Sequence, residues 1–490
     1  MPAVDTARAI LSTLEDLGLT HVLYCPGSRS APFAYALEAG AFGGDARPVL
    51  DERSAGFAAV GLARTGALPA IIVTSGTAVA ELTPAVLEAS HARLPLLVLS
   101  ADRPGELRGV GASQATAQAG LFGVHACASI DLEPQEPSRS LVGQLSRALA
   151  AALGAPTGTP GPVQINVAFR DPLTPQGVRV GAESDGGSAP DPADEAPAAF
   201  VPRPTRALPA RPDVRLIVVD AGTPWVDISG NASIVVPALA APRVPSCDAT
   251  WAARVRSAAD EAASRIDALL AGGSGRSMLD LARAVAAATV GPLVLGASNP
   301  VRAFDLAVAS LNGRHVYSNR GQAGIDGTIA TAVGIALGLG AYAHRDEASA
   351  PRSARRGKHM DSDRAARVTA VMGDLTLSHD ASSLALAAAT GADLDIIVAD
   401  DEGGGIFATL EHGRAATPQA YDRWFGVAQA VNYEALAAAY RIGFARAYAP
   451  SELASILRAP VTGPRLIHVP IERAAHLYAQ ARNALCEAEF

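Results

Sequence analysis

The feature that most constrains this chain is a series of short apolar runs separated by longer helical patterns. In the first third of the chain these runs are HVLYC (21–25), AIIVTS (70–75), PLLVLSA (95–101) and VQINVA (163–168). Buried strands of a parallel sheet read as continuous apolar runs, because helices cover both faces of such a sheet. Residues 1–180 are therefore predicted to form an α/β domain with a parallel sheet.

The same alternation returns in the C-terminal half. Its principal apolar runs lie at 292–298, 367–374, 395–407 and 465–471. These runs predict a second large α/β domain over residues 273–490.

The region between the two large domains has a different composition. Residues 181–212 are rich in Pro, Ala, Gly and acidic residues and show no periodicity, which is typical of a linker. Residues 213–272 contain two short apolar runs and a helical pattern at 251–270, which predict a short middle domain. The expected fold is α/β, with two large parallel-sheet domains around a smaller central α/β domain. A polar, patternless stretch at 344–364 is expected to be a surface loop.

The composition excludes several classes of function. A formal charge of -8 over 490 residues gives no reason to expect nucleic acid as a partner. The four cysteines lie far apart and lack zinc-site spacing, which fits a reducing, cytoplasmic compartment. The N-terminus has acidic residues and no continuous apolar core, so it does not read as a signal peptide. The longest weakly polar stretch, 328–343, is too short to span a membrane.

Two segments place an aspartate at the end of a predicted strand. Asp374 and Asp401 each follow an apolar run, and the two positions are 27 residues apart. That spacing is about the length of one strand–helix–strand crossover, which would put both carboxylates on neighbouring parallel strands. Ligands of open α/β folds bind at this carboxyl edge of the sheet.

Two converging carboxylates repel each other unless a proton or a cation lies between them. Mg2+ prefers oxygen ligands and completes its octahedron with phosphates. The glycines at 403–405 let backbone groups approach a diphosphate closely. The alternative is a strand-end turn in which Asp374 caps a helix. The spacing and the glycines together favour a metal–diphosphate site.

These segments resemble the diphosphate-binding motif of thiamine-diphosphate enzymes, which opens with Gly-Asp and closes at an Asn-rich strand end. The opening here is Gly373-Asp374-Leu375, where most of the superfamily has a second Gly. The closing pair is Asp400-Asp401 in place of Asn. An Asp can replace Asn as an oxygen ligand while adding negative charge, so metal binding is expected to survive this difference.

The resemblance implies a set of metal and cofactor ligands. Asp374, the Asp401 side chain and the Gly403 carbonyl would coordinate Mg2+, with Mn2+ as a substitute. Further cofactor contacts would come from the residues around them: Gly373, Leu375, Gly404, Ile406 and Phe407.

A glutamate in the N-terminal half extends the resemblance. Glu52, in DERSAGF (51–57), follows a strand-like run and leads into a helical pattern. Taken alone, Glu52 between Asp51 and Arg53 reads as a surface salt-bridge residue. The resemblance implies a catalytic role, in which Glu52 protonates N1′ of the cofactor aminopyrimidine and so promotes loss of the thiazolium C2 proton.

Further motifs narrow the family. They are CPGSRSAPFAYAL (25–37), TSGTAVAELTPAVLEA (74–89), ADRPGELRGVGASQ (101–114) and SNRGQAGIDGT (318–328). Together with the motifs above they closely resemble the 2-succinyl-5-enolpyruvyl-6-hydroxy-3-cyclohexene-1-carboxylate synthases of menaquinone biosynthesis, in the same order over both large domains. The resemblance implies decarboxylation of 2-oxoglutarate and a Stetter-like 1,4-addition of the succinyl semialdehyde carbanion equivalent to isochorismate.

Both implied substrates are dicarboxylates, and arginine presents the side chain best suited to binding carboxylates. The motif loops carry four arginines at predicted strand ends: Arg29, Arg103, Arg302 and Arg320. Any one of them alone would read as a solvated surface charge. The resemblance adds Ser28, Gln114 and Ser298 as neutral hydrogen-bonding groups, and Ile325 as the apolar residue that bends the cofactor. Alone, Ile325 would read as core packing.

The resemblance also implies an assembly. The cofactor of this fold class lies between the N-terminal domain of one subunit and the C-terminal domain of another, so a homodimer is the minimum unit and a homotetramer is common.

Two alternatives remain open. An acetohydroxyacid-synthase-like carboligase or decarboxylase would use small monocarboxylate keto acids and often binds FAD. The short middle region and the lack of a GxGxxG after a strand argue against FAD. A non-catalytic member would be expected to have lost Glu52 or one of the metal carboxylates.

Overall fold

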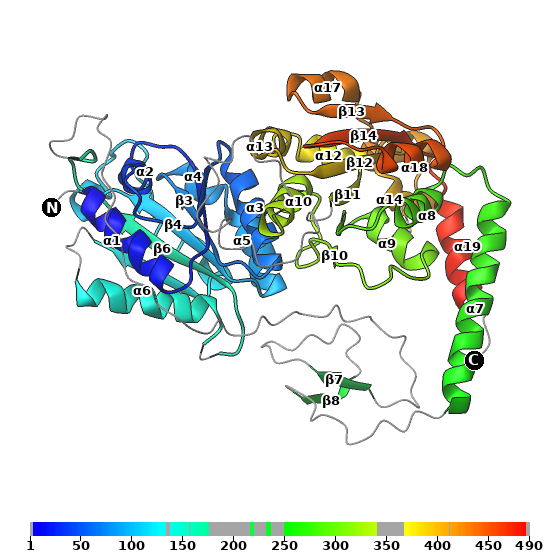
Figure 1. Cartoon of the computed structure of the whole chain (residues 1–490), viewed down its shortest axis with the longest axis horizontal. Helices are drawn as coiled ribbons and strands as arrows, with labels where there is room; N and C mark the ends of the chain where they lie inside the picture. Colours follow the sequence, from blue (N-terminus) through cyan, green and yellow to red (C-terminus); the bar gives the residue numbers. More distant parts are fainter. Residues whose placement is uncertain are drawn as a thin grey trace.

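The computed structural model describes residues 3–133, 138–155, 157–175, 216–219, 232–236, 249–340, 367–410 and 412–486. Two six-stranded parallel sheets dominate these residues (Figure 1). Their strand orders are β2-β1-β3-β4-β6-β5 and β10-β9-β11-β12-β14-β13. Numbered within its own domain, each sheet has the order 2-1-3-4-6-5, so the two large domains share one topology.

The N-terminal sheet is covered by helices on both faces. Its strands are β1 (His21–Tyr24), β2 (Asp45–Pro48), β3 (Pro69–Val73), β4 (Leu96–Asp102), β5 (Ala128–Leu132) and β6 (Pro162–Ala168). Its main helices are α1 (Ala3–Asp16), α2 (Ala31–Glu38), α3 (Glu52–Arg64), α5 (Thr83–Ala92) and α6 (Arg139–Ala152). Helices α1, α2 and α6 pack on one face, and α3 and α5 pack on the other.

The C-terminal sheet has the same layered construction. Its strands are β9 (Leu293–Leu295), β10 (Val316–Tyr317), β11 (Val368–Gly373), β12 (Leu394–Asp400), β13 (Gly443–Arg446) and β14 (Arg465–Pro470). Helices α8 (Met278–Ala288), α9 (Asn299–Ala307), α18 (Pro450–Arg458) and α19 (Ala475–Cys486) pack on one face. Helices α10 (Thr328–Gly338), α12 (Asp374–His379), α13 (Ser383–Thr390) and α17 (Tyr433–Ala439) pack on the other.

The predicted parallel-sheet architecture is confirmed in both large domains. Every apolar run named above for these domains overlaps a strand of the corresponding sheet. The strand-like run before Glu52 overlaps β2, and the pattern missed two strands, β5 and β13, which both lie at a sheet edge. The residues of these two strands are only partly buried, so they do not form a continuous apolar run.

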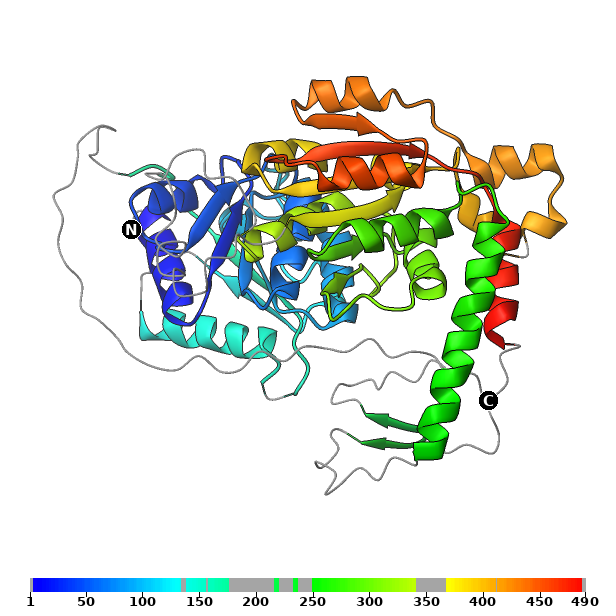
Figure 2. The same ribbon diagram turned by 45° about the vertical axis from the view of Figure 1, so that its right-hand side comes forward.

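The region between the two sheets is described in part. Strands β7 (Leu216–Val219) and β8 (Ala232–Val236) pair in parallel, and the long helix α7 (Ala249–Ala271) lies beside α19 (Figure 2). The predicted linker at 181–212 and the predicted loop at 344–364 lie outside the described residues. The boundaries of the middle domain stay a prediction.

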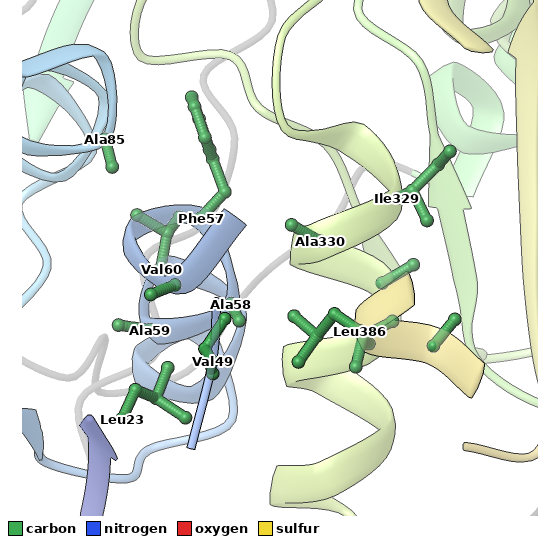
Figure 3. Packing of buried hydrophobic residues seen from close by; sticks show 14 of the residues in the cluster. Leu23, Val49, Phe57, Ala58, Ala59, Val60, Ala85, Ile329, Ala330 and Leu386 are labelled. Atoms are coloured by element: carbon green, nitrogen blue, oxygen red, sulfur yellow. The ribbon is translucent and has the colours of Figure 1, made fainter. Parts of the chain in front are cut away.

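The two large domains are joined by packing of α3 against α10 (Figure 3). Phe57 and Ala58 on α3 and Ala330 on α10 belong to one continuous apolar cluster that spans both domains. The helices approach so closely that a Cβ on Gly61 would overlap the Thr331 backbone carbonyl. Glycine is therefore required at this contact because it has no side chain.

Among the described residues, no helix combines the length and the apolar character needed to cross a bilayer.

Candidate active site

The register of β11 and β12 brings the two predicted metal carboxylates to one place. The strands are neighbours and parallel, with Gly373 paired to Ala399. Asp374 begins α12 directly after β11, and Asp401 follows the last residue of β12. The expectation that both aspartates lie at the carboxyl edge of neighbouring strands is confirmed.

The two carboxyl groups are electrostatically coupled. Burial raises the pKa of Asp374 to about 6, and the charge of Asp400 adds to this shift. Burial also raises the pKa of Asp401 to about 7, with the charge of Asp374 as the next cause. When both of these buried acids are ionised, their charges repel each other. A proton shared between them, or a bound cation, removes this repulsion.

The surroundings of these acids suit a metal ion with a phosphate. Asp374 is 2% exposed, and its Oδ2 atom has no hydrogen-bond partner among the described residues. A Cβ on Gly405 would overlap the Asp401 carboxylate, and one on Gly403 would overlap the Gly426 backbone carbonyl. Gly403 also has a φ of 122°, which favours glycine. The described residues contain no group of three or more His, Cys, Asp or Glu side chains placed to hold a metal, so the remaining ligands would be a backbone carbonyl, phosphate and water.

The other predicted cofactor contacts lie around this pair. Leu375 lies in α12, and its backbone N–H donates to the Asp374 carboxylate. Gly404 is the N-cap of the short helix α14 (Gly405–Ala408), which contains Ile406 and Phe407. The Tyr421 hydroxyl donates to the Gly404 carbonyl at 2.8 Å and so fixes this turn.

A polar cluster beneath the acidic pair was not predicted from the sequence. His468 Nε2 lies 2.9 Å from a carboxylate oxygen of Asp400, and Arg446 Nε donates to His468 Nδ1 at 3.1 Å. The donation to Nδ1 leaves the ring proton on Nε2, where it bonds to Asp400. The Tyr433 ring stacks on His468 with centroids 4.1 Å apart. His468 lies within an apolar strand run, and only the strand order places it beside β12.

This cluster separates the roles of the two adjacent aspartates. Burial alone would raise the pKa of Asp400, but hydrogen bonds from His468, the Glu402 N–H and Tyr433 hold it below its ordinary value. Asp400 is thus satisfied by protein groups, whereas Asp401 faces Asp374. Arg473 contacts the Asp401 backbone carbonyl through Nε and Nη2 at 3.2 and 3.1 Å, which orients the turn after β12.

The predicted catalytic glutamate lies in the N-terminal domain. Glu52 is the first residue of α3, directly after the N-cap Asp51. Burial raises the pKa of Glu52, and the charges of Asp51 and Glu81 add to the shift. Glu52 is therefore an acid with a high proton affinity at the start of a helix, and its charged neighbours come from the same domain.

Arg29 and Arg103 form one pair at the carboxyl edge of the N-terminal sheet. Arg29 Nη1 donates to the Phe169 carbonyl at 2.9 Å. Arg103 is 8% exposed and donates through Nη1 to the Ser75 hydroxyl and to the Gln114 carbonyl. Burial lowers the pKa of Arg103, and the charge of Arg29 is the next cause. Two cations held this close favour an anionic ligand between them. The predicted ligand residue Ser28 lies beside Arg29 and is exposed.

Arg302 and Arg320 form a second pair in the C-terminal domain. Arg302 Nη1 lies 3.2 Å, and Arg320 Nη1 lies 3.0 Å, from the Ala297 carbonyl. Arg302 also donates to the Ser298 carbonyl at 2.7 Å. Burial lowers the pKa of Arg302, and the charge of Arg320 is the next cause. The predicted ligand residue Ile325 is 37% exposed in the loop that also carries Arg320.

The predicted site residues thus fall into two groups. One group lies on the N-terminal domain: Ser28, Arg29, Glu52, Arg103 and Gln114. The other lies on the C-terminal domain: Ser298, Arg302, Arg320, Ile325, Asp374, Asp401 and the residues around them. Within the part of the chain that the structure describes, no hydrogen bond or ion pair joins Glu52, Arg29 or Arg103 to any of the C-terminal site residues.

A second polar cluster, which was not predicted from the sequence, lies in the N-terminal domain around Gln118. Gln118 is 1% exposed, and its Nε2 donates to the Ala101 carbonyl at 3.0 Å and to Asn166 Oδ1 at 2.8 Å. Its Oε1 accepts the Gly76 N–H at 3.2 Å. Asn166 in turn donates to the buried Asp102 at 2.9 Å. The cluster connects the loop that carries Gln114 to β4, the strand that ends directly before Arg103. The polar alternation of β4 and β6 (Ser100, Asp102, Gln164 and Asn166) was the available signal.

Comparisons with known proteins agree with this geometry. Residues 4–121 match the thiamine pyrophosphate enzyme N-terminal TPP binding domain, and residues 304–469 match the C-terminal TPP binding domain. The benzoylformate decarboxylase of Polynucleobacter necessarius has the same fold, with a TM-score of 0.63 and 14% identity over 96% of this chain and 99% of that one.

Three similar proteins are named 2-succinyl-5-enolpyruvyl-6-hydroxy-3-cyclohexene-1-carboxylate synthase. The Kineococcus radiotolerans protein is 37% identical over 96% of both chains. The Rhodococcus erythropolis protein is 36% identical over 99% of this chain and all of its own, and the Nocardia farcinica protein is 35% identical over 98% and 99%. The chain therefore belongs to the 2-succinyl-5-enolpyruvyl-6-hydroxy-3-cyclohexene-1-carboxylate synthase family of thiamine pyrophosphate enzymes.

Proposed function

We propose that this chain is a thiamine-diphosphate- and Mg2+-dependent carboligase. It would decarboxylate 2-oxoglutarate and join the remaining four-carbon unit to isochorismate, giving 2-succinyl-5-enolpyruvyl-6-hydroxy-3-cyclohexene-1-carboxylate and CO2. The observation that carries the proposal is the combination of one buried acidic pair with two arginine pairs at sheet edges. The acidic pair suits a Mg2+–diphosphate group, and the arginine pairs suit substrates with several carboxylates.

The residues that would hold the metal are the Asp374 and Asp401 carboxylates and the Gly403 carbonyl. The unpartnered Oδ2 of Asp374 and the raised pKa values of both acids support this assignment. Bound thiamine diphosphate would supply a carbanion and an electron sink, which protein side chains lack.

Glu52 would hold and transfer a proton through its side-chain carboxyl. Because burial raises its pKa, this carboxyl keeps a proton closer to neutral pH than an exposed glutamate does. A general acid whose pKa lies nearer the working pH exchanges protons efficiently with a heteroaromatic nitrogen.

The arginine pairs would bind and orient the two dicarboxylates. Each pair holds two like charges close together, and a carboxylate between them would relieve that repulsion. Arginine is also suited to this role because its planar fork binds a carboxylate through two parallel hydrogen bonds. Ser28, Gln114 and Ser298 would contribute neutral hydrogen bonds at the same edges.

The separation of the site residues into two groups supports a homodimer. The N-terminal group of one subunit would face the C-terminal group of the other, and a two-fold axis would create two identical sites. Apolar side chains beside the site residues of a single chain agree with this arrangement: Leu50, two residues before Glu52, is 85% exposed, and Ile325 is 37% exposed. A homotetramer would combine two such dimers.

The decisive experiment is incubation of the protein with thiamine diphosphate, Mg2+, 2-oxoglutarate and isochorismate, with identification of the product by mass. The expected product contains isochorismate joined to a succinyl group, with one CO2 released for each. Faster CO2 release from pyruvate than from 2-oxoglutarate would favour an acetohydroxyacid-synthase-like enzyme instead. Cofactor binding without turnover of either keto acid would favour a non-catalytic member.

A further inference from the structure

The loop between β10 and α10, residues 318–327, carries Arg320 and Ile325. One end of the loop is fixed within its own domain, since Asn319 Nδ2 donates to Thr331 Oγ1 at 3.0 Å. The Arg320 guanidinium then reaches back to the Ala297 carbonyl. The next contact of the loop is made by a residue of the other large domain.

That residue is Glu88, which lies in α5 of the N-terminal domain and is 2% exposed. Its Oε1 accepts the backbone N–H of Gly321 at 3.0 Å, and its Oε2 accepts that of Gln322 at 2.7 Å. Arg64, in the last turn of α3, donates to Oε1 at 2.7 Å and pairs with the charge. A single buried carboxylate thus satisfies two amides of a loop more than 200 positions away in the sequence.

The fit between α5 and this loop leaves no room for a side chain at Gly321. A Cβ on Gly321 would lie 2.7 Å from the Glu88 backbone carbonyl and 2.9 Å from its Oε2. A buried carboxylate requires hydrogen bonds and a compensating charge, and Gly321, Gln322 and Arg64 together provide both. The contact is therefore directional, and an apolar side chain in place of Glu88 would leave the Gly321 and Gln322 amides without this acceptor.

We infer that Glu88 is a positioning residue of the active site, which holds the Gly321 and Gln322 amides so that Arg320 is presented to the substrate and Ile325 to the cofactor. The inference deepens the proposed function and rests on it for the role of Arg320 as a carboxylate-binding group. It also gives α5 a role in the site. The segment between β3 and this helix contains Ser75, which accepts a hydrogen bond from Arg103, and Glu88 on the helix itself binds the loop of Arg320. One N-terminal segment thereby fixes a member of each arginine pair.

The direct test is the variant Glu88→Gln, studied as the full-length protein with thiamine diphosphate and Mg2+. An amide has one acceptor oxygen, so it cannot accept both backbone N–H groups and also pair with Arg64. We expect hydrogen exchange of the Gly321 and Gln322 amides to rise about tenfold or more, while exchange in α5 and α10 stays slow. We expect the KM for the dicarboxylate that Arg320 binds, either 2-oxoglutarate or isochorismate, to rise about tenfold with less than about a threefold change in kcat, because ground-state anion binding is weakened.

Glu452→Gln is the matched control. Glu452 is an exposed carboxylate that accepts the Tyr448 N–H at 2.8 Å, so the same substitution removes a carboxylate–amide contact far from the loop. It should leave exchange at Gly321 and Gln322 and the KM values for both dicarboxylates unchanged. If Glu88→Gln fails to fold, the pair Arg64→Met with Glu88→Leu removes both charges together and serves in its place.

The outcomes separate the inference from the proposed function. Unchanged exchange at Gly321 and Gln322, in whichever of these variants folds, overturns the role of Glu88 regardless of activity. If exchange at Gly321 and Gln322 becomes faster and kcat falls while the KM values for both dicarboxylates stay unchanged, Glu88 does not position Arg320 for substrate binding. If the wild-type protein makes no product, the proposed function is wrong. Hydrogen exchange at Gly321 and Gln322 then still tests whether Glu88 holds these two amides.

Discussion

The carboxyl groups of Asp374 and Asp401 meet at the ends of two neighbouring parallel strands, and the charge of Asp374 raises the pKa of Asp401. Asp400, the residue before Asp401, is instead held ionised by His468 and Tyr433. The strand end therefore carries one carboxylate that protein groups satisfy and one that is directed to a ligand. This difference between adjacent aspartates leads to predictions about metal binding and stability.

The first prediction concerns the pH dependence of metal binding. The pKa of Asp374 is raised to about 6 and that of Asp401 to about 7, so protons compete with Mg2+ for both groups. Affinity for Mg2+ with thiamine diphosphate should rise from pH 5 to pH 8, and binding near pH 6 should release protons. Calorimetry in buffers of different ionisation enthalpy measures this release. Binding at pH 6 without any proton release would contradict the assignment.

The second prediction concerns Asp401→Asn in the metal-free protein. A carboxyl group whose pKa is raised on folding contributes stability that is complete below its unfolded pKa and is lost as pH rises through the folded value. For Asp401 this loss occurs up to about pH 7. The variant lacks the charge, so it should be more stable than the wild type at pH 8 by about 1 kcal/mol and nearly equal to it at about pH 4, near the unfolded pKa of Asp.

The same variant should bind Mg2+ more weakly but still measurably. Its amide keeps an oxygen ligand and loses one negative charge. Thermal unfolding at several pH values, with and without Mg2+ and cofactor, measures both effects. A metal-free variant that is less stable than the wild type at pH 8 would show that Asp401 is not under charge repulsion.

Much of this site could be predicted because parallel strands place their ends at one edge. The spacing of Asp374 and Asp401 was sufficient to place them together, since one crossover separates neighbouring strands. His468 could not be predicted in the same way. It lies on β14, which is next to β12 in space but follows β13 in the sequence, and strand order is not contained in an apolar run.

The fold, like the site, could be predicted only in part from the sequence. The buried strands were predicted because burial on both faces requires apolar residues throughout, as in β3 and β4. The partly buried edge strands β5 and β13 have no such requirement and left no continuous apolar run. The contact of Glu88 with Gly321 joins two domains, and no local pattern contains it.

The third prediction tests the packing between the two large domains. A Cβ on Gly334 in α10 would overlap the Ala58 backbone carbonyl on α3, and backbone atoms cannot move aside without separating the helices. Gly334→Ala should therefore lower the free energy of unfolding by roughly 2–3 kcal/mol.

Gly143→Ala in α6 is the matched control, because its Cβ would meet only the end of the Arg147 side chain at 3.6 Å. That control should be neutral or stabilising by about 0.5–1 kcal/mol, as expected for Gly→Ala within a helix. Equal effects of both substitutions would contradict close packing at Gly334.

The fourth prediction concerns Glu52. Glu52→Gln keeps the shape of the side chain but removes the carboxyl proton, whose affinity is raised by burial. Decarboxylation of 2-oxoglutarate should fall by about two to four orders of magnitude, the usual contribution of a general acid–base group. Binding of Mg2+ and thiamine diphosphate should remain close to that of the wild type, because the metal ligands lie on the other domain. Undiminished turnover in this variant would remove Glu52 from the mechanism.

The fifth prediction tests whether the two groups of site residues meet across subunits. Glu52→Gln disables the N-terminal group and Asp374→Ala disables the C-terminal group, so each variant alone should keep at most about 1% of wild-type activity. If each site combines the two groups from different subunits, a mixed dimer contains one site with both defects and one intact site. Equal mixing with full subunit exchange should then restore about a quarter of wild-type activity, since half of the dimers are mixed and each has one working site.

Recovery of activity should follow the rate of subunit exchange, measured with labelled subunits. If subunits exchange and no activity returns, both groups belong to a site within one chain, and the dimeric site is wrong.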